Sequence, residues 1–205
     1  MNSIAFCPYQ YGLILAGASS DGTVSILMHS DVDDSWDVSK IRDNALGVNA
    51  VSWGPFNDTY MRLVTGGCDN QVRFWRKKVI KEGDDVVTDW EIDLESVCGG
   101  ELNHTDWVRD VAWSPIQLGG VEETVASCSE DGSVLIWTKK TDETIWIPTL
   151  LNQFDAPVWR LSWSLTGNIL AVSSGDGDVS LWKKEFDTGV WGRVSNVDDQ
   201  NTDET

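Results

Sequence analysis

The sequence predicts an all-β fold built from four repeated units. In each unit an aspartate in a turn pair is followed six residues later by a large apolar residue, and these closing residues are Leu27, Trp75, Trp137 and Trp182. They follow one another at intervals of 48, 62 and 45 residues, close to the ~40–45-residue period of a WD-repeat propeller blade with loop insertions. The chain also holds 12 tryptophans among 205 residues. Blades that pack face to face need large apolar residues on both faces, so the predicted fold is a WD-repeat β-propeller with four blades present.

Each unit is predicted to form four short strands joined by tight turns. The turn pairs are Asp21-Gly22, Asp69-Asn70, Asp131-Gly132 and Asp176-Gly177, and such pairs favour hairpins because their second residues tolerate positive φ. A further tryptophan begins each fourth strand: Trp36, Trp90, Trp146 and Trp191. The blade anchors are predicted to be Trp53, Trp75, Trp113, Trp163 and Trp182. Among the 12 tryptophans, only Trp159 has no place in this scheme.

The predicted blades divide a single propeller domain into four segments. They occupy residues 1–43, with the blade incomplete at its start, then 44–103, 104–153 and 154–194. Residues 195–205 contain four acidic groups and no basic one, and such charge blocks are commonly disordered. We therefore expect a disordered acidic tail after the fourth blade.

The polar residues of the third unit predict a buried structural network. His104 stands nine residues before Trp113, and its spacing to Ser127, Asp131 and Trp137 is that of the hydrogen-bonded set that ties the strands of a WD blade together. Asp21, Asp69 and Asp176 are the aspartates in the same position of the other units. A His/Ser/Asp trio can also indicate nucleophilic catalysis, but the blade spacing favours the structural interpretation. The second and fourth units carry Asn44 and Phe154 in place of the histidine, so their blades are expected to close without the full network.

Composition argues against most other chemistry. The formal charge of −18 disfavours nucleic acid or anionic lipid as a direct ligand, because both need clustered Lys and Arg. Residues 176–178 lack the remaining ligands of a calcium loop, and the four cysteines form no C-x-x-C pair. No apolar run approaches the ~18 residues of a membrane span. We predict no catalytic residue, cofactor or metal, and a cytosolic protein with reduced cysteines at positions 7, 68, 98 and 128.

Basic residues follow three of the closing tryptophans, and two interpretations of them stay open. They fall in equivalent turns and therefore on one rim of the propeller, where they could bind an acidic partner or simply be solvated. These residues are Arg76, Lys77, Lys78, Lys139, Lys140, Lys183 and Lys184.

Longer phrases resemble one WD-repeat family in particular. The stretches 104–115 (HTDWVRDVAWSP), 47–55 (GVNAVSWGP), 64–70 (VTGGCDN) and 159–171 (WRLSWSLTGNILA) are similar to the small WD-repeat subunits of the COPII outer coat, and the likeness runs from Asn2 to about Trp191. The resemblance implies an open six-bladed propeller without catalytic activity, shared between the COPII cage and the Y-shaped complex of the nuclear pore. In both, an α-solenoid partner subunit would insert a β-segment as an additional blade. The implied locations are the cytoplasm, ER exit sites and COPII vesicles, with peripheral membrane association through the coat, and the nuclear envelope.

The chain departs from that family in its number of blades. Its four units look like the family's third to sixth, so we expect a partial, open propeller from a fragment or truncated gene model that lacks two blades, roughly 80–90 residues. Two other WD-repeat adaptors remain as alternatives: a sibling nuclear-pore propeller and a ubiquitin-ligase substrate receptor. No partner-contact residue is assigned from the sequence.

Overall fold

The computed structural model describes residues 1–79, 89–93, 102–116, 122–140, 143, 145–185 and 187–196. Its strands form four antiparallel sheets of four strands, and each sheet keeps its strands in chain order. The first blade contains β1 (Ser3–Phe6), a short 3-10 helix (Tyr9–Tyr11), β2 (Ile14–Ala18), β3 (Thr23–Ser30) and β4 (Ser35–Arg42). The second contains β5 (Val48–Trp53), β6 (Tyr60–Gly67), β7 (Val72–Lys78) and β8 (Glu91–Ile92).

The other two blades repeat this order. The third contains β9 (Val108–Trp113), β10 (Glu122–Ser129), β11 (Ser133–Lys140) and β12 (Ile147–Gln153). The fourth contains β13 (Val158–Trp163), β14 (Ile169–Ser174), β15 (Val179–Lys184) and β16 (Trp191–Asn196). Strand β16 pairs with β15 through Asn196, so the expected start of the tail at Ser195 is wrong by two residues. Residues 197–205 of that tail lie outside the described residues.

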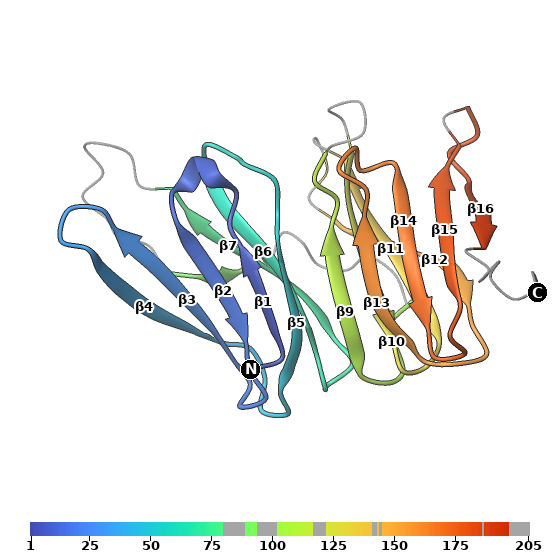
Figure 1. Cartoon of the computed structure of the whole chain (residues 1–205), viewed down its shortest axis with the longest axis horizontal. Coiled ribbons are helices and arrows are strands. Elements are labelled where there is room, and N and C mark those ends of the chain that lie inside the picture. The colour runs from blue at the N-terminus through green and yellow to red at the C-terminus, as the bar shows by residue number, and fades with distance from the viewer. Residues whose placement is uncertain are drawn as a thin grey trace, which may run out of the picture.

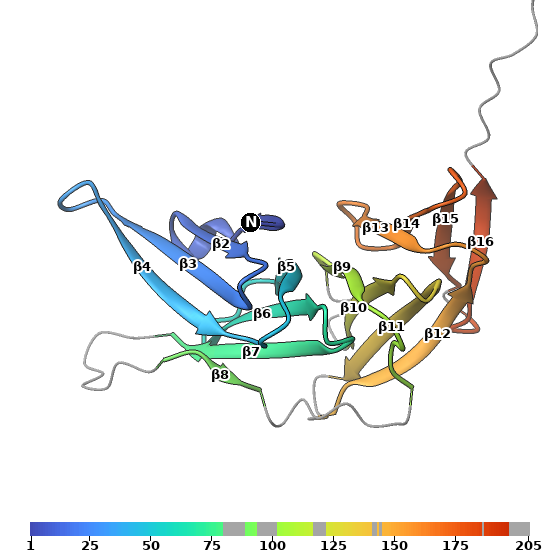
Figure 2. The same cartoon turned by 90° about the horizontal axis from the view of Figure 1, so that it is seen from below.

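The four sheets stand side by side as an open arc (Figure 1). Seen from below, they fan out around a common centre, with β5, β9 and β13 at its inner edge (Figure 2). Each of these inner strands contacts the inner strand of the preceding blade. The arc is open between the first and fourth blades (Figure 2). The architecture is therefore the partial, open WD propeller that the sequence predicts.

The turn between the second and third strand of each blade depends on backbone freedom at one residue. Gly22, Asn70, Gly132 and Gly177 have φ values of 81°, 67°, 80° and 91°, in the left-handed region that glycine and asparagine tolerate best. At Gly22 an added Cβ would also lie 1.7 Å from the backbone oxygen of Asn44. Glycine therefore lets the chain that leads into the next blade pass directly against the turn.

The core consists of three apolar clusters, one at each junction between neighbouring blades. Trp53 and Trp75 are buried between the first and second blades, Trp113 between the second and third, and Trp182 between the third and fourth. Trp163 is half-buried against the last cluster. In the middle cluster Phe74 stacks on the fully buried Trp146, with ring centroids 4.3 Å apart. The predicted anchors thus join blades to one another.

Two ion pairs cross the same junctions. Arg62 on β6 donates to both carboxylate oxygens of Glu123 on β10 at 2.5 Å, and both residues are buried. The Arg62 guanidinium also lies 5.2 Å from the Trp113 ring. Lys184 on β15 contacts Glu122 at 2.5 Å, but both of these side chains remain more than a fifth exposed. The first pair is therefore the one whose loss would leave an uncompensated buried charge.

We expect Glu123→Ala to destabilise the protein by about 3 kcal/mol, because Arg62 stays buried without its partner. At this chain length that corresponds to a fall in Tm of roughly 6–12 °C in thermal unfolding followed by circular dichroism. The neighbouring Glu122→Ala is the matched control and should cost about 1 kcal/mol or less, since its ion pair is partly solvated. Equal losses for the two variants would contradict the importance assigned to the buried pair.

Candidate functional site

The structure brings together the four residues predicted as a network in the third blade. His104 is buried just before β9; its Nε2 lies 2.7 Å from Ser127 Oγ and its Nδ1 lies 2.7 Å from Ser133 Oγ. The indole N–H of Trp137 donates to the same Ser127 oxygen at 2.8 Å. The imidazole therefore links the segment before β9 to both β10 and β11.

Asp131 completes this set from the β10–β11 turn. Its carboxylate accepts hydrogen bonds from the Ser133 hydroxyl at 2.6 Å and from the Thr105 amide at 2.6 Å. Nδ1 of His104 lies 3.8 Å from Oδ2, which is close enough for electrostatic attraction but too long for a hydrogen bond. Partial burial raises the pKa of Asp131, but the neighbouring histidine and these donors outweigh it, so the net pKa lies well below its ordinary value.

The accessibility of this set fits a structural role better than a catalytic one. The Ser127 side chain is fully buried, and its oxygen already contacts both His104 and Trp137. A nucleophile must reach a substrate and have a free base beside it.

The three described cysteines form no disulfide, and burial raises the pKa of the Cys7 thiol to about 12. Cys98 lies outside the described residues.

The second blade closes with a different network, which the sequence-based expectation missed. The indole N–H of Trp75 donates to Thr65 Oγ1 at 3.0 Å, and the Thr65 hydroxyl in turn donates to Asp43. Arg73 bridges Asp43 at 3.0 Å and Asp69 at 2.5 Å. Asn44, at the position of the histidine, instead accepts the backbone amides of its own loop. The signal was present in the sequence, because Thr65 precedes Asp69 by the same four residues as Ser127 precedes Asp131.

The remaining predicted aspartates stay within their own turns. Asp21 accepts from the backbone and the hydroxyl of Thr23, and Asp176 accepts from Ser174 and from the amide of Asp178. The structure does not join either to a tryptophan in the described residues. In the fourth blade the Trp182 indole donates to Ser180 on its own strand, at 2.8 Å.

Three of the seven basic residues of the predicted rim form ion pairs among the described residues. Arg76 contacts Glu91 and Asp93, Lys140 contacts Glu143, and Lys184 contacts Glu122. These pairs offset part of the positive charge of the rim. Among the described residues, no cluster of three or more His, Cys, Asp or Glu side chains has the geometry to hold a metal ion.

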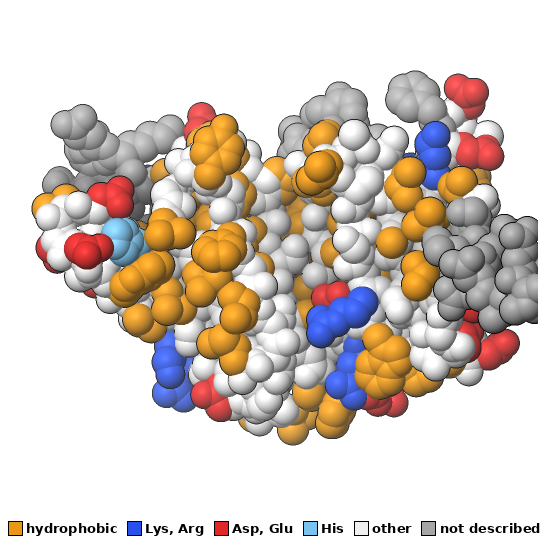
Figure 3. Space-filling view, viewed as in Figure 1, with side chains coloured by type: hydrophobic (Ala, Val, Ile, Leu, Met, Phe, Trp, Pro, Cys, Tyr) orange, Lys and Arg blue, Asp and Glu red, His pale blue; other side chains and the backbone are white. Residues whose placement is uncertain are grey.

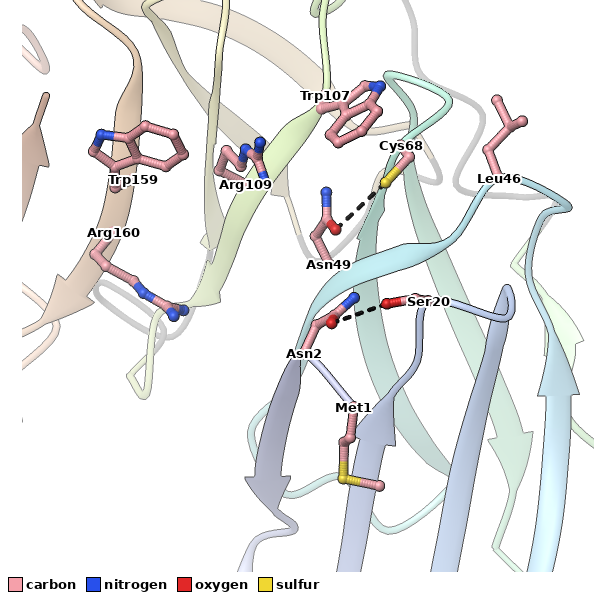
Figure 4. A pocket seen from close by; sticks show the side chains of 10 residues that line it. All are labelled: Met1, Asn2, Ser20, Leu46, Asn49, Cys68, Trp107, Arg109, Trp159 and Arg160. Carbon is pink, nitrogen blue, oxygen red and sulfur yellow. Dashed lines mark hydrogen bonds between the residues drawn. The ribbon is translucent and has the colours of Figure 1, made fainter.

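An open groove of about 620 Å³ lies where the inner strands meet (Figure 4). Its chemistry comes mainly from two tryptophans and two arginines of the third and fourth blades. The complete lining is Met1, Asn2, Ser20, Leu46, Asn49, Cys68, Trp107, Arg109, Trp159 and Arg160. Figure 4 shows Arg109 between the two tryptophan side chains. Trp159, the tryptophan to which the repeat pattern assigns no position, thus lines the groove.

Comparison with known proteins defines the class. Residues 37–76, 96–138 and 148–183 match the model of the WD40 family, described as WD domain, G-beta repeat. Together with the open arc of four-stranded sheets, this match shows that the chain belongs to the WD40 family.

Similarity to individual proteins places the chain in one group within the WD40 family. The chain is 40% identical to the Protein SEC13 homolog of Drosophila melanogaster over 85% of its own length and 49% of that relative. It is 42% identical to the human SEC13 homolog over 77% of its length and 49% of the relative, and 36% identical to Protein transport protein SEC13 of Mycosarcoma maydis over 97% and 60%. The chain is a SEC13-type WD-repeat protein, and it spans about half the length of the first two of these relatives. The part of the chain that the structure describes contains no helix with the length and apolarity to cross a bilayer.

We expect His104→Ala to lower the stability of the third blade by about 2 kcal/mol, because the hydroxyls of Ser127 and Ser133 lose a buried partner. Thermal melts should show Tm falling by roughly 4–8 °C. His29→Ala is the control with the same side chain, since His29 contacts only exposed carboxylates by salt bridge and should cost about 1 kcal/mol or less. An unchanged Tm for His104→Ala would refute the network.

Because the pKa of Asp131 is lowered in the folded protein, we expect the stability of the fold to depend on pH. A carboxylate whose folded pKa is lowered stabilises the protein above its unfolded pKa of about 3.9, and that stabilisation is lost as the pH falls toward the folded pKa. Asp131→Asn should therefore have a lower Tm than wild type at pH 7, and the difference should narrow at pH 3. Asp37→Asn, a change at an exposed position on β4, serves as the control. A gap that stays constant or widens at pH 3 would contradict the assignment.

Proposed function

We propose that the chain acts as a non-enzymatic scaffold in protein transport, as a component of the COPII outer coat and of the Y-shaped complex of the nuclear pore. Relatives named as protein transport proteins support the first part of the proposal, and the quoted sequence phrases support the coat family. The observation that carries the proposal is structural: among the residues that the structure describes, nothing covers the blade faces at the two ends of the arc.

The end face of the fourth blade consists of side chains that interior blades bury. In the third blade, Ala126, Val134 and Ile136 point toward the fourth blade and are completely buried. By strand register, the corresponding residues of the fourth blade are Ala171, Val179 and Leu181, and these are only half-buried. This face therefore has the apolar character of a blade junction but lacks its partner blade.

The opposite end face shows the same contrast more strongly. Ile4, Phe6 and Val38 of the first blade are 59%, 69% and 58% exposed, whereas Val51 and Trp53, at the positions of Ile4 and Phe6 in the second blade, are 4% and 8% exposed. Figure 3 shows apolar side chains gathered over the first blade. Uncovered apolar faces of this kind are characteristic of interaction surfaces.

In the proposed scaffold, each end face packs against a further β-sheet. The face of the fourth blade accepts the blade donated by the α-solenoid partner, and the face of the first blade fits another propeller blade. The protein then has no transmembrane role of its own and works peripherally, on coat membranes of the early secretory pathway and at the nuclear envelope.

The proposal is tested by reconstituting the chain with the α-solenoid outer-coat subunit and measuring complex formation by size-exclusion chromatography. We expect a complex with wild type and at least a tenfold loss of affinity for Leu181→Asp, because a carboxylate would be buried at the junction. Leu165→Asp is the matched control, since Leu165 is 92% exposed in the β13–β14 turn. Affinity purification that recovers cullin-type ligase components and no coat partner would refute the scaffold role.

A further inference from the structure

A β-bulge recurs at the start of the inner strand in the last three blades. The pairing register shifts between Val48 and Ala50, opposite Arg109 at Cys128 and Ser129, and between Val158 and Arg160. The unpaired residues are therefore Asn49, Arg109 and Trp159. A bulge redirects the side chain of its extra residue, and all three of these side chains line the groove.

In the first two blades an asparagine at this position connects neighbouring blades; Asn49 lies in a bulge, whereas Asn2 directly precedes β1. Asn49 donates its amide to the Val108 carbonyl of the next blade at 2.9 Å. Asn2, in the same position of the first blade, donates to the Val48 carbonyl, also at 2.9 Å. Each asparagine side chain therefore forms a hydrogen bond to the backbone of the blade that follows it.

Arg109 occupies this position in the third blade but does something different. Its guanidinium carbon lies 5.1 Å from the Trp107 ring and 5.0 Å from the Trp159 ring, and it forms an ion pair with Glu130. Stacking on aromatic faces holds a guanidinium in a fixed plane. Since Trp107 and Trp159 are still 44% and 42% exposed, the groove presents a preorganised surface of two indoles with an arginine between them.

The charge of the groove is opposite to that of the chain. The protein carries a formal charge of −18, yet the residues lining the groove include two arginines and no aspartate or glutamate. Since Glu130 pairs with Arg109, Arg160 supplies the positive charge that a ligand would meet. The Arg160 side chain is exposed and forms no hydrogen bond or ion pair among the described residues, and its charge acts on the partly buried carboxylate of Asp110. Exposed tryptophan and arginine are the residue types that contribute most to binding at protein interfaces.

We propose that this groove binds an acidic linear segment of a partner protein. Carboxylates of the segment accept hydrogen bonds from the guanidinium of Arg160, and an adjacent apolar side chain lies against the exposed indole faces of Trp107 and Trp159. This interaction goes beyond the scaffold function, because Trp107 precedes β9 of the third blade and belongs to neither end face.

The test is selection of a random-peptide phage library on the full chain, followed by fluorescence polarisation with the selected peptides. We expect enrichment of peptides in which Asp or Glu flanks an aromatic or leucine residue. Their affinity should fall at least about tenfold with Trp107→Ala and with Arg160→Glu. Because both side chains are exposed, these variants should keep the wild-type circular dichroism spectrum.

Matched controls are Trp36→Ala, whose side chain is 47% exposed on the first blade, and Arg42→Glu, exposed on β4. Both should bind the selected peptides as wild type does. Selected peptides without acidic residues, or equal binding by groove and control variants, would overturn the proposal. So would binding of an oligothymidylate that Arg160→Glu abolishes while no acidic peptide binds.

Discussion

Face-to-face packing of four-stranded sheets is the interaction on which the rest of this structure depends. A blade has two apolar faces, and neither can be buried by the blade itself. At the three junctions inside the arc, side chains such as Leu63, Val125 and Leu170 become completely buried. In the part of the chain that the structure describes, the same requirement leaves one apolar blade face uncovered at each end of the arc.

In the second and third blades the closing tryptophan is tied into a polar network, although the two networks differ. The third blade places the imidazole of His104 between two hydroxyls. The second blade instead uses the carboxylate of Asp43, with Arg73 as its counter-ion. Both satisfy the buried indole N–H of the closing tryptophan through a hydroxyl, Ser127 or Thr65. What these two blades share is therefore a hydroxyl that accepts from the closing indole, and the residues that surround this hydroxyl can differ.

The groove and the end faces divide the surface into regions with different chemistry. The end faces are apolar and extended, and suit the broad contact of another sheet. The groove combines two indoles with guanidinium groups, which suits the proposed acidic segment. In the proposed scaffold, large partners bind at the two ends of the arc, and the groove at its centre is a separate surface. The bulge at Asn49 also supplies one of the two asparagine hydrogen bonds that connect the earlier blades.

The sequence by itself determined the features that are local and periodic. The repeat interval, the turn residues with positive φ and the tryptophans at blade junctions follow from spacing and from backbone propensity, and the spacing of His104, Ser127, Asp131 and Trp137 is read within one unit. Only the tertiary structure decided that Asp43 and Arg73 complete the second blade, and that Trp107, Arg109 and Trp159 meet in one groove. The contact of Arg109 with Trp159 joins residues of different blades, and a bulge sets the direction of both side chains. The direction of those side chains depends on how whole strands pair, which the residues at those positions do not encode alone.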